Sequence, residues 1–121
     1  MPLDMVKELQ PIGDAFKLCQ YGQALAQLEE LWERIPSPRE AVLNSFLAVR
    51  YGVAIALKAD DLNRASEWAT RGLPYSGGFN VMGESEFLAG EVAFARSELE
   101  DARRYFMAAK KLSVRCFPGP G

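Results

Sequence analysis

Apolar residues recur at steps of three and four residues through most of the chain, the spacing that brings them onto one face of an α-helix. Segments in which apolar and polar residues alternate, as they do along a half-buried strand, are almost absent. The pattern therefore predicts an all-α fold. We expect helices over residues 3–19, 22–34, 38–60, 61–73 and 80–95, a last helix after residue 97, and a break or a new start in the first helix at Pro11.

Two segments have the composition of a helix start. Ser37-Pro38-Arg39-Glu40 places a serine before a proline at the first helical position and a glutamate at the third, so the serine and the glutamate can each cap a free backbone N–H. Ser97-Glu98-Leu99-Glu100 repeats the capping-box pattern, with a serine and a glutamate three residues later. We therefore expect helices to begin at Pro38 and directly after Ser97.

Small residues recur at long intervals, which indicates an internal repeat. Ala24, Ala65 and Ala102 each lie near the start of a predicted helix and are 41 and 37 residues apart. Gly52 and Gly90 lie 13 and 12 residues before the alanine that follows them. A small residue on each helix lets two antiparallel helices approach closely, so the chain is predicted to consist of stacked helix pairs.

At these residues the chain resembles the tetratricopeptide repeat family. The clearest unit contains Gly90, Ala102, Phe106 and Ala109, where that family has its small and aromatic packing residues. The resemblance implies a short superhelix of about three units, over residues 5–36, 38–74 and 80–113, with a tail at 114–121. The chain departs from the family pattern at Pro11 and Gly13, at the end of the second unit, and in the loop at 75–83.

Residues 28–38 (LEELWERIPSP) and 105–117 (YFMAAKKLSVRCF) carry a second resemblance. They are similar to small tetratricopeptide-type proteins found beside bacterial toxins, where such proteins act as immunity proteins. Those proteins often continue into an acidic segment, which is not found after Phe117 in this sequence. The resemblance implies a protein partner, namely a cognate toxin.

Composition limits the chemistry open to the chain. Its 121 residues suffice for one domain and include no histidine, which excludes Ser/His and Cys/His nucleophile pairs and histidine ligands for zinc. The two cysteines, Cys19 and Cys116, form no CxxC motif and are expected to be reduced thiols. The first residues do not have the composition of a secretory signal, and no apolar run approaches the length of a membrane helix, so we expect a cytoplasmic protein without membrane contact.

Candidates for catalysis or ligand binding are few. Glu84, Glu86 and Glu91 lie near a glycine-rich segment, and paired carboxylates can carry out acid/base chemistry in an enclosed cleft. A three-unit helical stack has only a shallow groove, so these residues are expected to be solvated. The glycine-rich segment lacks the lysine and the preceding strand of a phosphate-binding loop. We therefore expect no enzyme activity, no cofactor and no metal site.

Charge is distributed unevenly although the net charge is only −2. Residues 1–33 contain six acids and two lysines, whereas the last helix contains five cations without an acid from residue 102 onwards: Arg103, Arg104, Lys110, Lys111 and Arg115. Such a cluster can track phosphates, but a sequence pI near 5.2 argues against general affinity for nucleic acid. A charged patch that steers an oppositely charged protein is the preferred interpretation.

The resemblance to tetratricopeptide repeats also implies a binding groove along the first helix of each pair. Its expected lining residues are Phe46, Val49, Arg50, Val53, Glu84, Phe87, Glu91 and Phe94. Other aromatic residues at helical spacing, such as Trp32 and Trp68, are expected in the core. The leading hypothesis is a non-catalytic interaction module that blocks a toxin. An adaptor or chaperone that binds peptide segments is the alternative, followed by nucleic-acid binding through the last helix.

Overall fold

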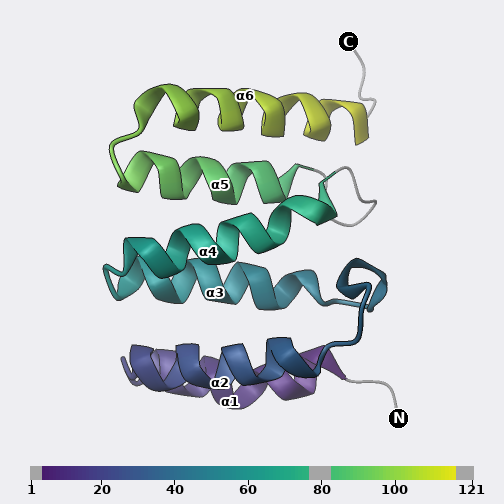
Figure 1. The fold of residues 1–121 in the computed structure, drawn as a ribbon, viewed down its shortest axis with the longest axis vertical. Helices are drawn as coiled ribbons and strands as arrows, with labels where there is room; N and C mark the ends of the chain where they lie inside the picture. The colour runs from purple at the N-terminus through teal and green to yellow at the C-terminus, as the bar shows by residue number, and fades with distance from the viewer. Residues whose placement is uncertain (1–3, 77–82, 117–121) are drawn as a thin grey trace.

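The computed structural model describes residues 4–76 and 83–116, of which residues 113–116 are described by their backbone alone. This part of the chain contains helices and no strand, which confirms the expected all-α fold (Figure 1). The α-helices are α1 (Met5–Lys17), α2 (Tyr21–Arg34), α3 (Phe46–Lys58), α4 (Leu62–Gly72), α5 (Glu84–Ala95) and α6 (Leu99–Cys116). Two short 3₁₀ helices, η1 (Arg39–Ala41) and η2 (Leu73–Tyr75), lie between them.

The six helices form three antiparallel pairs that stack in chain order, with α1 and α2 at one end and α6 at the other (Figure 1). Each pair is closed by the same tight turn. Its central residue has a left-handed backbone, with φ of 60° at Cys19, 58° at Asp60 and 65° at Ser97. The next N–H bonds back into the first helix, for example from Gln20 to the Ala15 carbonyl at 2.9 Å. The turns are 41 and 37 residues apart, as the alanines are, so the chain repeats in structure as well as in sequence.

Ala24, Ala65 and Ala102 occupy equivalent places in the three pairs. Each donates its backbone N–H to the carbonyl of the residue just before the second helix, and each is almost fully buried. Gly52 and Gly90 also allow the close approach of paired helices that was predicted for them. A Cβ on Gly52 would lie 2.2 Å from the Trp68 ring, and one on Gly90 would lie 2.6 Å from the Phe106 ring. Both glycines therefore allow a ring from the second helix to pack onto the first.

The helix expected to begin at Pro38 begins at Phe46, and the helix-start prediction at Ser37 is wrong. Residues 39–41 form only η1, after which Val42 is extended and Asn44 has a left-handed backbone with φ of 63°. Ser45 holds this segment in place, because its hydroxyl bonds the Arg39 carbonyl at 2.6 Å and the Tyr75 hydroxyl at 2.8 Å. Contacts with η2 thus stabilise a folded connection where the sequence pattern favoured a helix.

Four further details differ from the expectation. Ser97 is the left-handed residue that ends α5 and not the cap of α6, because the Glu98 carbonyl accepts the first hydrogen bond of α6 from Ala102. Pro11 lies inside α1 without a break, since the buried face of the helix continues on both sides of it. Helix α5 begins at Glu84, later than residue 80, and α6 extends through residues 114–116, which were expected in the tail. Residues 77–82 and 117–121 of the predicted loop and tail lie outside the described residues.

Candidate partner-binding surface

Three of the eight expected groove residues belong to the core, so their prediction as groove residues is wrong. Phe46, Val49 and Val53 on α3 are 7%, 0% and 1% exposed. The physical reason is that α3 lies at the centre of the stack and contacts α1, α2, α4 and α5, so that neighbours cover its apolar face. Val49, for example, packs closely against Gly72 of α4. A Cβ added to Gly72 would lie only 2.8 Å from Val49 Cγ1.

Four of the expected residues form one surface across α3 and α5, which we call the α3–α5 stripe: Arg50, Glu84, Phe87 and Glu91. The Arg50 guanidinium makes two hydrogen bonds to the Glu84 carboxylate, of which Nη2 to Oε1 measures 2.6 Å. Glu84, Phe87 and Glu91 follow one another at helical spacing on α5. The ion pair is partly exposed and contributes little stability by itself. Its two hydrogen bonds orient the Arg50 side chain of α3 toward Glu84 at the start of α5.

The Glu91 carboxyl of the stripe has a perturbed pKa. Partial burial raises the pKa of Glu91 above its ordinary value of 4.5, and repulsion from the nearby Glu84 carboxylate raises it further. The interaction with Glu84 agrees with the seven-residue spacing, which places both carboxylates on one side of α5. Glu91 therefore keeps its proton to a higher pH in the folded protein than in the unfolded chain.

The raised pKa of Glu91 predicts a specific pH dependence for Glu91→Gln. Between the unfolded and folded pKa values the native state binds more protons, so the free energy of unfolding falls as pH rises through that window. Glu91→Gln does not lose this stability as pH rises, because the glutamine side chain does not ionise. It should match the wild type at pH values below the unfolded pKa and be more stable at neutral pH, as measured by urea unfolding across the pH range. Equal pH profiles would contradict the assignment. Glu84→Gln should make the pH dependence due to Glu91 weaker without removing it, since burial is the larger cause of the raised Glu91 pKa.

Phe87 and Phe94 project from α5 toward the last helix. Phe87 is 49% exposed, and its ring centre lies 5.5 Å from that of Phe106 on α6. Phe94 is 63% exposed and lines a different feature, an open hollow of about 480 Å³ that we call the α6 hollow. Its other lining residues, all on α6, are Leu99, Ala102, Arg103, Phe106, Met107 and Lys110. Phe94, predicted in the groove, is thus part of the end of the stack, and four of the eight expected residues make up the stripe.

The cations predicted as a docking patch do not act as one group. Arg103 and Lys110 line the α6 hollow, whereas Arg104 pairs with the Asp101 carboxylate on its own helix. Lys111 is exposed and does not line the hollow, and the side chain of Arg115 lies outside the described residues. Among the predicted cations whose side chains the structure describes, only Arg103 and Lys110 therefore combine positive charge with an apolar surface.

The fold separates Glu86 from the other two carboxylates considered for catalysis. Glu86 is buried, and its carboxylate accepts a hydrogen bond of 3.0 Å from the Ser85 hydroxyl, whereas Glu84 and Glu91 lie on the stripe. Among the described residues, no group of three or more cysteines and carboxylates is placed to hold a metal ion. In that same part of the chain, every helix is too short or too polar to cross a bilayer.

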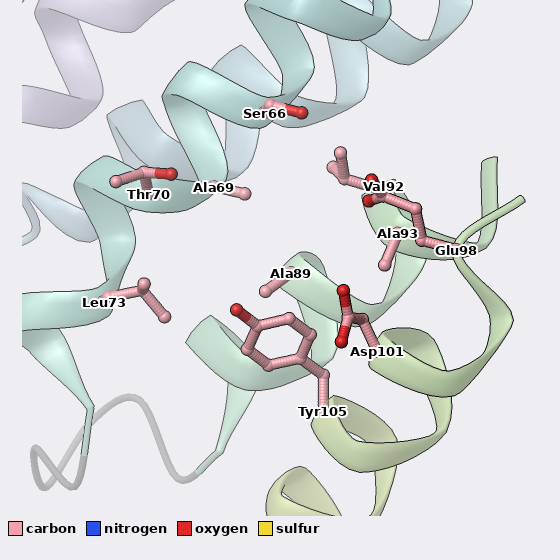
Figure 2. Close-up of a pocket in the computed structure, with 10 residues that line it drawn as sticks. All are labelled: Ser66, Ala69, Thr70, Leu73, Ala89, Val92, Ala93, Glu98, Asp101 and Tyr105. Atoms are coloured by element: carbon pink, nitrogen blue, oxygen red, sulfur yellow. The ribbon is translucent and has the colours of Figure 1, made fainter. Parts of the chain in front are cut away.

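A small pocket at the junction of α4, α5 and α6 was not anticipated from the sequence, because three separate helices build it (Figure 2). Its volume is about 130 Å³, room for about four water molecules. Figure 2 shows the Tyr105 hydroxyl directed toward the space between Leu73 and Ala89. The two carboxylates at its border already have arginine partners, since Glu98 pairs with Arg96 and Asp101 with Arg104. The pocket therefore has no uncompensated charge with which to select a charged ligand.

Comparison of the chain with protein-family models, with curated proteins and with solved structures gave no match. The function must therefore be inferred from the chemistry of the stripe and of the hollow.

Proposed function

We propose that this chain is a non-catalytic protein-interaction module of the tetratricopeptide-like kind, and that it is an immunity protein which binds and blocks a cognate bacterial toxin. The observation that carries the proposal is the α3–α5 stripe, in which a half-exposed aromatic ring lies beside charges of both signs. The repeated turns and buried alanines support the tetratricopeptide-like part. The similarity of residues 28–38 and 105–117 to toxin-associated proteins supports the more specific part.

The composition of the stripe suits binding to a folded protein. Interfaces commonly place an aromatic or arginine anchor at the centre and polar groups around it. Phe87 would supply the apolar anchor, while Arg50, Glu84 and Glu91 would supply the directional contacts. All four residues lie on helices, so their backbone is already ordered before a partner binds.

In this proposal the protein inhibits by steric occlusion, with the stripe covering a surface that the toxin needs for activity. The acidic first helix pair and the cations of α6 would speed association with an oppositely charged partner, since charge patterning mainly raises the association rate. The proposal places the protein in the cytoplasm, where a free thiol such as the exposed Cys19 stays reduced.

The test uses the protein encoded by the gene next to this one, co-expressed and purified with the full chain. We expect a stable complex and rescue of cells that express the neighbour alone. Phe87→Ala and Arg50→Glu should each weaken the complex by at least about tenfold, as hot-spot substitutions do. Leu43→Ala and Arg64→Glu change an exposed apolar and an exposed basic residue away from the stripe, and should leave affinity unchanged.

Two outcomes would contradict the toxin-blocking proposal. The first is the absence of both complex and rescue with the neighbouring product. The second is binding of many unrelated short peptides, lost in Phe87→Ala, which would identify the chain as a peptide-binding adaptor.

A further inference from the structure

The α6 hollow corresponds to a surface that is covered elsewhere in the stack. Counting 37 residues back from its lining residues Arg103, Phe106, Met107 and Lys110 leads to one face of α4 and the start of η2, namely to Ser66, Ala69, Thr70 and Leu73. Those four residues face α5, because they line the junction pocket together with residues of α5 (Figure 2). In the second pair, this face is therefore occupied by the next helix.

In the first helix pair, too, this face of the second helix packs against the pair that follows. The equivalent positions on α2, 41 residues before those on α4, include Leu25, Leu28 and Trp32, which are 4%, 0% and 6% exposed. The second helix pair covers them, since α3 contacts α2 and the Trp68 ring of α4 lies 5.4 Å from that of Trp32. In both earlier pairs the following pair packs against this face. Burial is nearly complete on α2, whereas on α4 Ala69 is buried, Ser66 and Leu73 are half-buried and Thr70 remains exposed.

At α6 the corresponding face is open. Leu99 and Met107 are each 61% exposed, and Phe94 beside them is 63% exposed. Three large apolar side chains on one continuous surface are uncommon on a monomer without a binding role. Leu99 and Lys110 are about 16 Å apart along the helix, so a helix of three to four turns would cover the hollow.

The charges of the hollow indicate what such a helix carries. Arg103 and Lys110 lie among the apolar residues, no acidic residue lines the hollow, and neither cation forms an ion pair within the described part of the chain. The equivalent face of α4 has Ser66 and Leu73 at these positions. A helix bound to α6 therefore needs carboxylates beside its apolar face to pair with Arg103 and Lys110.

We propose that the α6 hollow binds an amphipathic helix of a partner protein, with an apolar face flanked by glutamates or aspartates, in the position that α3 and α5 take on the preceding pairs. This surface lies beyond the α3–α5 stripe, and its occupant is independent of the proposed function. A second copy of the chain fits poorly. Two α6 helices would bring Arg103 and Lys110 against the same cations. Helix α1 exposes Lys7 and Lys17 together with Asp14, and Val6 is its only large exposed apolar residue, so it lacks an apolar face flanked by carboxylates alone.

The experiment measures binding of fluorescein-labelled helical peptides of about 18 residues to the full chain by anisotropy. The first peptide has leucines on one face, glutamates flanking them and alanines elsewhere. The second has lysines in place of the glutamates. We expect the glutamate peptide to bind with micromolar affinity and the lysine peptide to bind at least about tenfold more weakly.

Variants of the chain localise the binding. Arg103→Glu with Lys110→Glu should weaken the glutamate peptide at least about tenfold and strengthen the lysine peptide. Arg64→Glu with Lys111→Glu makes the same change in net charge outside the hollow and should preserve the preference. Met107→Glu should abolish binding, whereas Leu43→Glu, at another exposed apolar residue, should not. Met107 and Leu43 are both exposed, so neither variant should affect folding.

Equal binding of the two peptides, or equal losses in the two charge-reversed variants, would overturn the proposal. Concentration-dependent self-association that Met107→Glu abolishes would also overturn it and assign the hollow to a second copy. None of these outcomes involves Arg50 or Phe87, so failure here is distinguishable from failure of the toxin-blocking proposal.

Discussion

Gly52→Ala is expected to lower the free energy of unfolding by about 3 kcal/mol, near the upper end for overpacking in a core. The added Cβ would lie 2.2 Å from Trp68 Cδ2 and within 2.7 Å of two further ring atoms. The ring has no room to retreat, because Trp68 is fully buried and packs edge-on against Trp32 at 5.4 Å between ring centres. Helices α3 and α4 would therefore have to move apart.

Two other glycines serve as controls in urea unfolding. Gly13→Ala places a Cβ no closer than 3.7 Å to Tyr51, so it should stabilise the protein by about 0.5–1 kcal/mol through helix propensity. Gly90→Ala should cost less than Gly52→Ala, because the half-buried Phe106 ring can turn into the α6 hollow. If Gly52→Ala were as stable as Gly13→Ala, the close packing of α3 on α4 would be contradicted.

Trp68→Ala is expected to cost about 4 kcal/mol, within the range for removing a buried tryptophan. Trp68 fills the space above Gly52, contacts Trp32, and lies beneath the Arg71 guanidinium at 4.4 Å from its ring centre. Arg71 also bonds Glu29 of α2 at 2.9 Å, so the residues around Trp68 connect the first two pairs. Loss of the ring leaves a cavity at this connection, which the surrounding helices cannot fully close.

Phe94→Ala is the matched control, because it removes a large aromatic side chain from an exposed site. Its effect should stay within about 0.5 kcal/mol. Thermal and urea unfolding of both variants would measure the difference, and similar losses would contradict the assignment of Trp68 to the core. The double variant Gly52→Ala with Trp68→Ala should lose less than the sum of the single losses, because the clash disappears with the ring.

Much of the fold could be predicted from the sequence because it depends on local regularities. The three- and four-residue spacing of apolar side chains identified the helices, and the intervals between Ala24, Ala65 and Ala102 identified their pairing. Both signals arise within one helix or between two helices adjacent in the chain. The predicted helix starts at Pro38 and Ser97 failed because the local capping pattern does not show what these segments contact elsewhere in the fold. Ser45 bonds a residue 30 positions away, and Ser97 serves to end the preceding helix.

The candidate site was predictable only in part. Arg50, Glu84, Phe87 and Glu91 lie together as the resemblance implied, but Phe46, Val49 and Val53 on the same predicted face are buried. A sequence pattern gives the direction of a side chain around its own helix axis. It does not reveal how many other helices surround that axis, and α3 has neighbours on most sides.

The sequence by itself determined the helical fold, its division into pairs and the residues through which paired helices approach, because these follow from helical periodicity and side-chain size. Only the tertiary structure decided which apolar residues remain exposed. The same face of the second helix contacts the following pair in the first two pairs and is open in the third, since burial depends on whether another helix follows in space. Arg103, Met107 and Lys110 are thus exposed through their position at the end of the stack.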